Sequence, residues 1–65
     1  MVVCKGNTRL ENFAEIYALI VNNGGSFIQA HRRELDQTVL IEVETTVAVW
    51  QQIIDNGLLY EVLYD

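Results

Sequence analysis

The amino-acid sequence predicts an α+β domain with the order strand, helix, strand, strand, helix, strand. Two kinds of periodicity carry this prediction. Apolar residues recur every three or four positions in two segments, and they alternate with polar residues in the segments between and after these. A third observation is that Gly and Asn residues gather where one periodicity gives way to the other. A chain of 65 residues is expected to form a single domain, residues 1–65.

The first strand and the first helix occupy the N-terminal third of the chain. Residues 2–5 suit a strand because they include β-branched valines, and Gly6 and Asn7 favour a turn after it. Residues 8–11 have the Ser/Thr-x-x-Glu pattern of a capping box, so a helix is expected to begin at Thr8. Asn and Gly at 22–25 favour its end. Its apolar stripe comprises Leu10, Phe13, Ala14, Tyr17, Ile20 and Val21.

Two strands are expected next, at residues 26–33 and 37–44, paired as a hairpin through residues 34–36. In the second of them, alternation places Val39, Ile41 and Val43 toward the core, and Thr38, Leu40, Glu42 and Glu44 outward. In the first, Ile28 and Ala30 are the better core residues. The outward set is therefore predicted to be Phe27, Gln29, His31 and Arg33.

The second helix and the last strand complete the order. Thr45 or Thr46 can cap the helix, and Asn56 with Gly57 can close it. Its predicted apolar stripe is Val47, Trp50, Ile53 and Ile54. Residues 58–65 alternate again, with Leu58, Tyr60, Val62 and Tyr64 assigned to the core face and Leu59, Glu61, Leu63 and Asp65 to the outer face.

This element order resembles a minimal βαββαβ ferredoxin-like two-layer sandwich, which would place the first and third strands at the centre of an antiparallel sheet. Right-handed crossovers would then send both helices to one face. The resemblance rests on element order alone, and many functions use this fold. An alternative is an αββαβ arrangement with a three-stranded antiparallel sheet and two helices, in which residues 1–5 form a loose arm.

Composition excludes several classes of protein. The chain is 51% hydrophobic and 20% charged, so it is not disordered by composition. Its apolar runs are shorter than the roughly 20 residues of a membrane span, and its start does not resemble a signal peptide. We therefore expect a cytoplasmic protein without a membrane partner. Cys4 is the single cysteine, which excludes an internal disulfide and a multi-cysteine zinc site and favours a reducing compartment.

The charge balance argues against nucleic acid as a direct partner. Nine acidic residues against four basic ones give a formal net charge of −5, which repels a phosphate backbone. The basic residues are Lys5, Arg9, Arg32 and Arg33, and they form no extended stripe.

No motif for catalysis, metal binding or a cofactor stands out, so we expect a protein that is not an enzyme and has no cofactor. His31, Arg32 and Arg33 could bind an anion, but a solvated strand end with ordinary surface pairing is the favoured interpretation. Glu42 and Glu44 share a strand face, where solvated carboxylates are the usual case. The sequence at 23–25 resembles part of a phosphate-binding loop, but it follows a helix instead of preceding one.

The remaining functional signal is a sheet face that the helices would leave uncovered, with leucines beside acids. An exposed apolar patch of this kind is typical of an interface. We therefore expect a small acidic protein-interaction module, a homodimer, that acts as a regulator, adaptor or inhibitor of a larger protein. Alternatives are a small-molecule-sensing domain and an inhibitor from a virus or mobile element that blocks a host nucleic-acid-binding protein. The expected protein-binding residues are Phe27, His31, Leu40, Glu42, Glu44, Leu59, Glu61 and Leu63.

Overall fold

The computed structural model describes residues 1–64, and the side chains of residues 1–63. Its elements follow the predicted order. They are β1 (Val2–Arg9), α1 (Leu10–Asn22), β2 (Ser26–Arg33), β3 (Thr38–Thr45), α2 (Val47–Asp55) and β4 (Leu59–Tyr64). The outward assignment of Asp65 lies outside the described residues, as does the orientation of the Tyr64 side chain.

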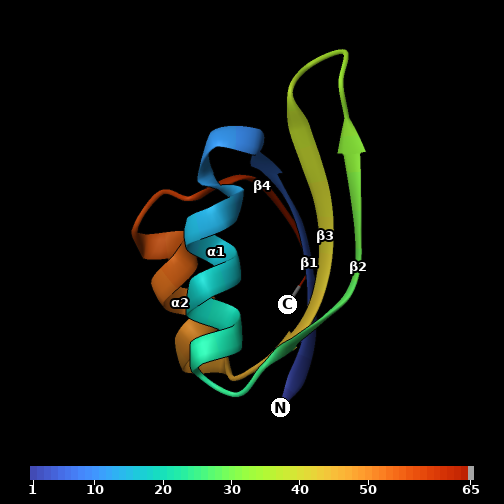
Figure 1. Cartoon of the computed structure of the whole chain (residues 1–65). Coiled ribbons are helices and arrows are strands. Elements are labelled where there is room, and N and C mark those ends of the chain that lie inside the picture. Colours follow the sequence, from blue (N-terminus) through green and yellow to red (C-terminus); the bar gives the residue numbers. More distant parts are fainter. Residues whose placement is uncertain (65) are drawn as a thin grey trace.

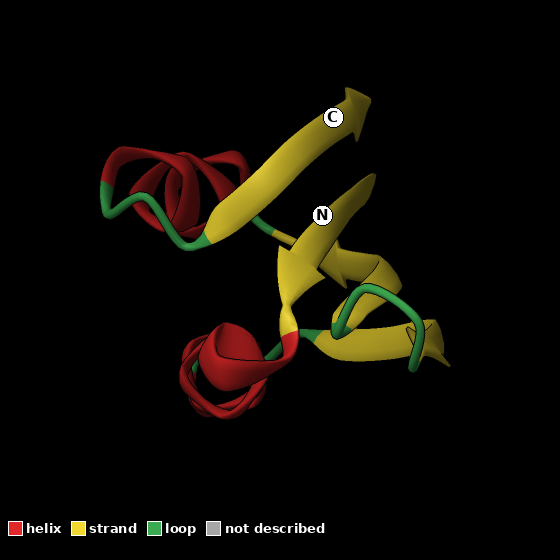
Figure 2. Ribbon diagram, turned by 90° about the horizontal axis from the view of Figure 1, so that it is seen from above, coloured by secondary structure: helices red, strands yellow, loops and turns green. Residues whose placement is uncertain are grey.

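The four strands form one antiparallel sheet in the order β2-β3-β1-β4. Both helices lie on the same side of this sheet (Figure 1), and the view from above shows the two layers (Figure 2). This is the topology of the ferredoxin-like fold, with the first and third strands central as predicted. The three-stranded alternative is wrong, because the N-terminal segment forms a central strand that pairs along both of its edges.

The first strand is longer than predicted, because Gly6 and Asn7 continue it and form no turn. Gly6 faces the helix layer, where a Cβ atom would lie 2.8 Å from the Glu61 carbonyl oxygen and 3.6 Å from Trp50 Cη2. A glycine here lets the β4 backbone and the indole ring approach the strand closely. Gly6 therefore allows close packing of β1 against β4 and Trp50 and does not form a turn.

The capping box predicted at residues 8–11 does not form. Thr8 lies inside β1, fully buried, and its hydroxyl donates a hydrogen bond to the Leu58 carbonyl at 2.7 Å. Arg9 takes the N-cap position without a side-chain bond. The Leu10 N–H donates instead to the carbonyl of Gln37 at 2.8 Å, so the turn after β2 satisfies the start of α1.

The other helix boundaries are confirmed. Of the two candidate caps for α2, Thr46 is the one used, because its Oγ1 accepts from the Val49 N–H at 3.2 Å. Helix α1 ends at Asn22, followed by Gly24 with φ +82°, and α2 ends at Asp55, followed by Gly57 with φ +69°. Both glycines adopt the left-handed conformation that closes a helix.

The buried stripes of both helices are rotated from the prediction. In α1 the buried residues are Ile16 and Ile20, whereas Ala14, Tyr17 and Val21 are exposed. The reason is that α1 packs against α2 as well as against the sheet. The buried side of α1 therefore points between α2 and the sheet. In α2 the stripe likewise includes Val49 with Trp50 and Ile53, while Val47 is 66% exposed.

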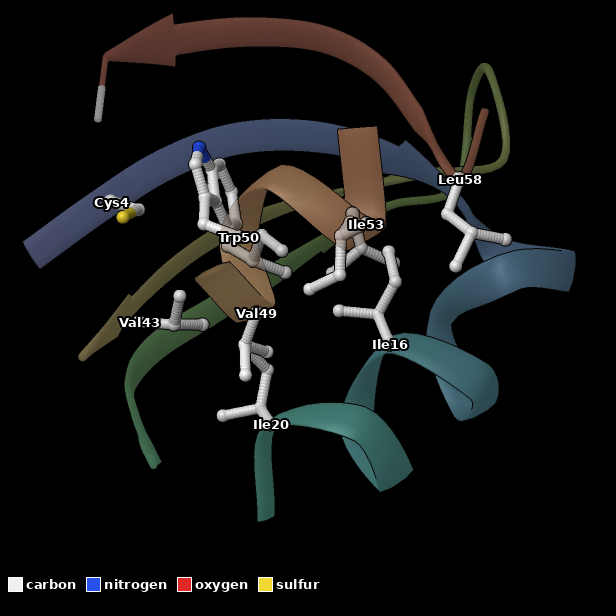
Figure 3. Close-up of a cluster of buried hydrophobic side chains, with 10 residues drawn as sticks. Cys4, Ile16, Ile20, Val43, Val49, Trp50, Ile53 and Leu58 are labelled. Atoms are coloured by element: carbon white, nitrogen blue, oxygen red, sulfur yellow. The ribbon is translucent and has the colours of Figure 1, made fainter. Parts of the chain in front are cut away.

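The core lies between the sheet and the helices and includes Trp50, the chain's single tryptophan (Figure 3). From β3 it takes the three residues that alternation predicted, Val39, Ile41 and Val43. Within the described chain, neither helix is long and apolar enough to cross a membrane. The buried apolar residues among those that the structure describes are Cys4, Ile16, Ile20, Val39, Ile41, Val43, Val49, Trp50, Ile53 and Leu58.

Two fully buried threonines offer a matched test of the packing. Replacing Thr8 by Val leaves the Leu58 carbonyl without its donor, and we expect the free energy of unfolding to fall by about 1–3 kcal/mol. Thr45 Oγ1 is buried without a partner among the described residues. Thr45→Val should therefore cost nothing, or stabilise the fold by about 1 kcal/mol. Urea denaturation measures both, and equal losses for the two variants would contradict these assignments.

Candidate functional site

The candidate site is the face of the sheet opposite the two helices, which we call the open face. Strand register decides which residues stand on it. Asn7 lies opposite Leu40, and Leu40 lies opposite His31, so these three residues share this face across β1, β3 and β2. The remaining members follow by alternation along each strand, and they include Lys5, Arg9, Gln29, Arg33, Glu42, Glu44 and Glu61.

Two predicted site residues, Phe27 and Leu59, are not on the open face. Phe27 pairs with Val43 and packs on the helix side, with its ring 5.6 Å from that of Phe13 and 5.4 Å from that of Tyr17. Leu59 pairs with Thr8 and packs against the core. The prediction is wrong for both because each strand carries an irregularity in its register, which shifts the alternation by one residue.

The extra residues at these irregularities are exposed instead of buried. In β2, Phe27 pairs with Val43 and Gln29 with Glu42, so Ile28 is unpaired and 52% exposed. In β4, Tyr60 is skipped in the same way and is 58% exposed. Simple alternation predicts both residues in the core, and this prediction is wrong. The Arg9 guanidinium lies over the Tyr60 ring, 4.8 Å from its centre.

A chain of hydrogen bonds crosses the open face from one edge strand to the other. Arg33 on β2 donates from Nη2 to Asn7 Oδ1 at 2.7 Å, passing over β3 to reach β1. Asn7 then donates from Nδ2 to Glu61 Oε1 on β4 at 2.8 Å. Asn7 is only 5% exposed, so it is the buried centre of this chain. The sequence does not identify Asn7 as a site residue, because Gly6 and Asn7 together favour a turn.

A second group of polar side chains lies on β2 and β3. Gln29 donates from Nε2 to Glu42 Oε1 at 2.7 Å, and His31 Nε2 lies 3.0 Å from Gln29 Oε1. Two of the predicted site residues, His31 and Glu42, are thus brought together through a glutamine. Both bonds are exposed to solvent, so they orient side chains more than they stabilise the fold.

The apolar part of the open face is smaller than predicted. Leu40 is half-buried at its centre, opposite both Asn7 and His31. Leu63 is 43% exposed and falls at the second irregularity of β4, between the residues paired with Lys5 and Gly6. Val3, which the prediction did not include, is 39% exposed on the same face. The expected patch of several leucines is therefore reduced to Leu40, with Val3 on the same face and Leu63 at the irregularity of β4.

The charges on the open face are balanced in number among the described residues, and the two arginines lie at the opposite end from Glu42 and Glu44. Arg9 and Arg33 both lie opposite Thr38, at the end of β3 next to the hairpin turn, which we call the arginine end. Glu42 and Glu44 lie toward the other end, the glutamate end. With Lys5 opposite Glu42 and Glu61 opposite Asn7, three cations and three carboxylates from the described part of the chain share the face.

Arg32 is excluded from this set, because it pairs with Val39 and lies on the helix side of β2. His31, Arg32 and Arg33 are thus split between two faces and do not converge on one anion. Glu42 and Glu44 do share a face, as predicted, but Glu42 is engaged by Gln29. Among the described residues, no three His, Cys, Asp or Glu side chains gather where they could hold a metal ion.

Asp36 adjoins the arginine end, in the turn between β2 and β3. Its Oδ1 accepts a hydrogen bond from the Thr38 hydroxyl at 2.7 Å. This bond, assisted by the charge of Arg33, holds the pKa of the Asp36 carboxyl below its ordinary value. The turn is closed further by Gln37, whose Nε2 donates to the Glu34 carbonyl at 2.9 Å.

Comparisons with protein-family models, with curated proteins and with solved structures yielded no match to this chain.

Removal of the Asn7 side chain tests whether the bonds across the sheet hold the open face together. In Asn7→Ala, Arg33 and Glu61 both lose their shared partner, so we expect the free energy of unfolding to fall by about 1–2 kcal/mol. Gln29→Ala is the matched control, because it also breaks two bonds but in an exposed position, and it should change stability by less than about 0.5 kcal/mol. Similar losses in both variants would show that Asn7 has no special role.

The Thr38–Asp36 bond predicts a pH effect. Because the pKa of Asp36 is lowered in the folded state, its carboxylate stabilises the fold above the unfolded-state pKa, and this contribution disappears as pH falls through the folded-state pKa. Thr38→Val should raise the pKa of Asp36 toward its ordinary value and reduce that loss. A carbon-13 NMR titration of the carboxyl measures the change, and an unaltered titration would contradict it.

Proposed function

We propose that this chain is a non-enzymatic protein-interaction module whose docking surface is the open face, and that the face pairs first with a second copy of the chain. Acting through this face, the module would serve as a regulator, adaptor or inhibitor of a larger protein. The observation that carries the proposal is the separation of charge on the open face, with arginines at one end, glutamates at the other and Leu40 between them.

This arrangement is self-complementary. A two-fold axis that lies between two open faces, perpendicular to the strands and near Leu40, would bring the arginine end of one copy over the glutamate end of the other. Arg33 and Arg9 would then meet Glu44 and Glu42. Homodimers with a two-fold axis use one patch on both subunits, and that patch must therefore carry both partners of every contact. The open face meets this requirement, whereas a face of uniform charge would repel its own copy.

The hydrogen bonds within the face support the proposal as well. Arg33, Asn7 and Glu61 are held together before any partner arrives, and so are His31, Gln29 and Glu42. Side chains that are already ordered lose less conformational entropy on binding, so more of the contact energy appears as affinity. Leu40 offers the apolar centre around which polar contacts can exclude water.

The charges on the open face also indicate what kind of larger protein could bind it. Three cations, Lys5, Arg9 and Arg33, share the face with the carboxylates, so the face does not imitate the uniform negative charge of a phosphate backbone. A partner surface with both signs of charge fits it better than the basic groove of a nucleic-acid-binding protein. An inhibitor that copies nucleic acid receives no support from this geometry.

Dimerisation should be strongest at low ionic strength and should weaken as salt screens the paired ends. Glu44→Lys places a cation opposite the arginine end, and each contact occurs twice in a two-fold dimer. We therefore expect the dissociation constant to rise by about tenfold at low salt. Sedimentation equilibrium at several salt concentrations measures both effects.

Glu15→Lys is the matched control, since it makes the same charge change on the exposed surface of α1, and it should leave the dissociation constant unchanged. A wild-type chain that stays monomeric at low salt and high protein concentration would overturn the pairing.

A photoreactive benzoylphenylalanine at position 44 or 15 would locate contacts with a larger protein in cells. We expect position 44, and not position 15, to give a crosslinked product heavier than the crosslinked homodimer. Equal products from both positions would overturn the assignment of the open face.

A further inference from the structure

An Asn-Gly pair follows each of the two helices. Asn23 and Gly24 follow α1, Asn56 and Gly57 follow α2, and all four residues are exposed. In such a pair the glycine nitrogen can attack the side-chain carbonyl carbon of the asparagine before it, because glycine has no Cβ to shield its nitrogen. The chain therefore has two candidate positions for the same chemical modification.

The surroundings of the two pairs are closely matched. Asn23 and Asn56 line one cavity of about 390 Å³ between the ends of the two helices. In each pair the glycine N–H donates to the carbonyl three residues earlier, at 3.1 Å after α1 and at 3.0 Å after α2. Either turn must therefore open before its glycine nitrogen can attack, and this requirement does not distinguish the two positions.

The asparagine carboxamides distinguish the two pairs. Asn23 Nδ2 donates to the Leu19 carbonyl at 2.7 Å, which holds that carboxamide back along α1. The Asn56 carboxamide makes no such bond within the described part of the chain. A Cβ atom at Gly57 would meet no described atom within 4 Å apart from its chain neighbours, so the space beside this residue is open. Asn56 can therefore turn toward the Gly57 nitrogen without first breaking a bond of its own side chain.

We propose that Asn56 is a site of spontaneous deamidation, with water as the second reactant. The Gly57 nitrogen forms a bond to Asn56 Cγ while the bond from Cγ to Nδ2 breaks. Nδ2 leaves as ammonia and takes with it the proton of the Gly57 nitrogen, and a cyclic succinimide remains. Water then opens the ring at one of its two carbonyl carbons. The product at position 56 is aspartate or isoaspartate, and either carries one added negative charge.

Either product would disturb the link between α2 and β4. The new carboxylate would follow that of Asp55 at the C-terminal end of α2, where the helix dipole favours cations. Isoaspartate would also add one carbon atom to the main chain of the turn. Leu58, two positions further on, is buried, and its N–H donates to the Ile53 carbonyl at 3.2 Å. Its carbonyl accepts the bond from the Thr8 hydroxyl, so a lengthened turn disturbs a contact of the core.

Incubation of the wild-type chain in oxygen-18 water at mildly alkaline pH measures both positions at once, because each ring opening incorporates a labelled oxygen. After transfer to ordinary water, trypsin separates them. Asn23 falls in the peptide 10–32, and Asn56 is the single asparagine of the peptide 34–65. We expect Asn56 to gain label about three- to tenfold faster than Asn23, because only Asn23 must also break a side-chain hydrogen bond.

The same incubation in urea is the control, because both pairs are then released from their turns and should react at similar rates. In the folded chain, equal labelling of the two asparagines or faster labelling of Asn23 would overturn the proposal. Asn56→Gln keeps a carboxamide but cannot form a succinimide, so it should remove the label from 34–65. Label that persists in that peptide would also contradict the assignment.

Ion-exchange chromatography separates the deamidated chain from the intact chain by its added charge. We expect the deamidated chain to unfold at a lower urea concentration, and an unchanged midpoint would refute the predicted effect on the fold. Neither Asn56 nor Gly57 belongs to the open face. Failure of these experiments therefore leaves the proposed dimer untouched, and a monomeric chain would leave the deamidation untouched.

Discussion

The pairing of β1 with β3 is the constraint on which the rest of the structure depends. These two strands pair along their full length, from Val2 opposite Thr45 to Arg9 opposite Thr38. Each then offers its other edge to β4 or β2, so the sheet and both crossovers are built outward from this ladder. The approach of the Trp50 ring and the β4 backbone to Gly6 holds the second helix and the last strand to the same ladder. A small core can organise a whole domain in this way because every element touches the central pair or its immediate neighbours.

The irregularities in the edge strands determine which surface each residue joins. One unpaired residue, Ile28, moves Phe27 to the helix side and leaves Gln29, His31 and Arg33 on the open face. A second, Tyr60, moves Leu59 into the core while Glu61 stays outside. Both irregularities lie at the edges of the sheet, where such bulges are common and can limit unwanted strand pairing. Their effect here is to take apolar side chains from the open face and leave it polar and ordered.

The periodicity of the sequence predicted the fold class, the element order and the central position of β1 and β3. It also predicted that Val39, Ile41 and Val43 lie in the core. The Asn and Gly residues after each helix predicted where the helices end. Of the expected site, His31, Leu40, Glu42, Glu44 and Glu61 are on the open face. Phe27 and Leu59 are not. Asn7 and Arg33 could not be identified as partners, because they are 26 residues apart and meet only when β3 lies between their strands.

The sequence by itself thus determined the local conformations, because helical and strand periodicities are properties of neighbouring residues. Only the tertiary structure decided where alternation breaks, since a bulge depends on how two distant strands fit together. It also decided the role of Thr8, whose hydroxyl had a local candidate partner in the helix start but bonds the carbonyl of Leu58, fifty positions away. The Thr8 hydroxyl bonds this distant carbonyl because Thr8 is buried. A hydroxyl inside the core must be satisfied by whichever group packing brings to it, and sequence proximity has no part in that choice.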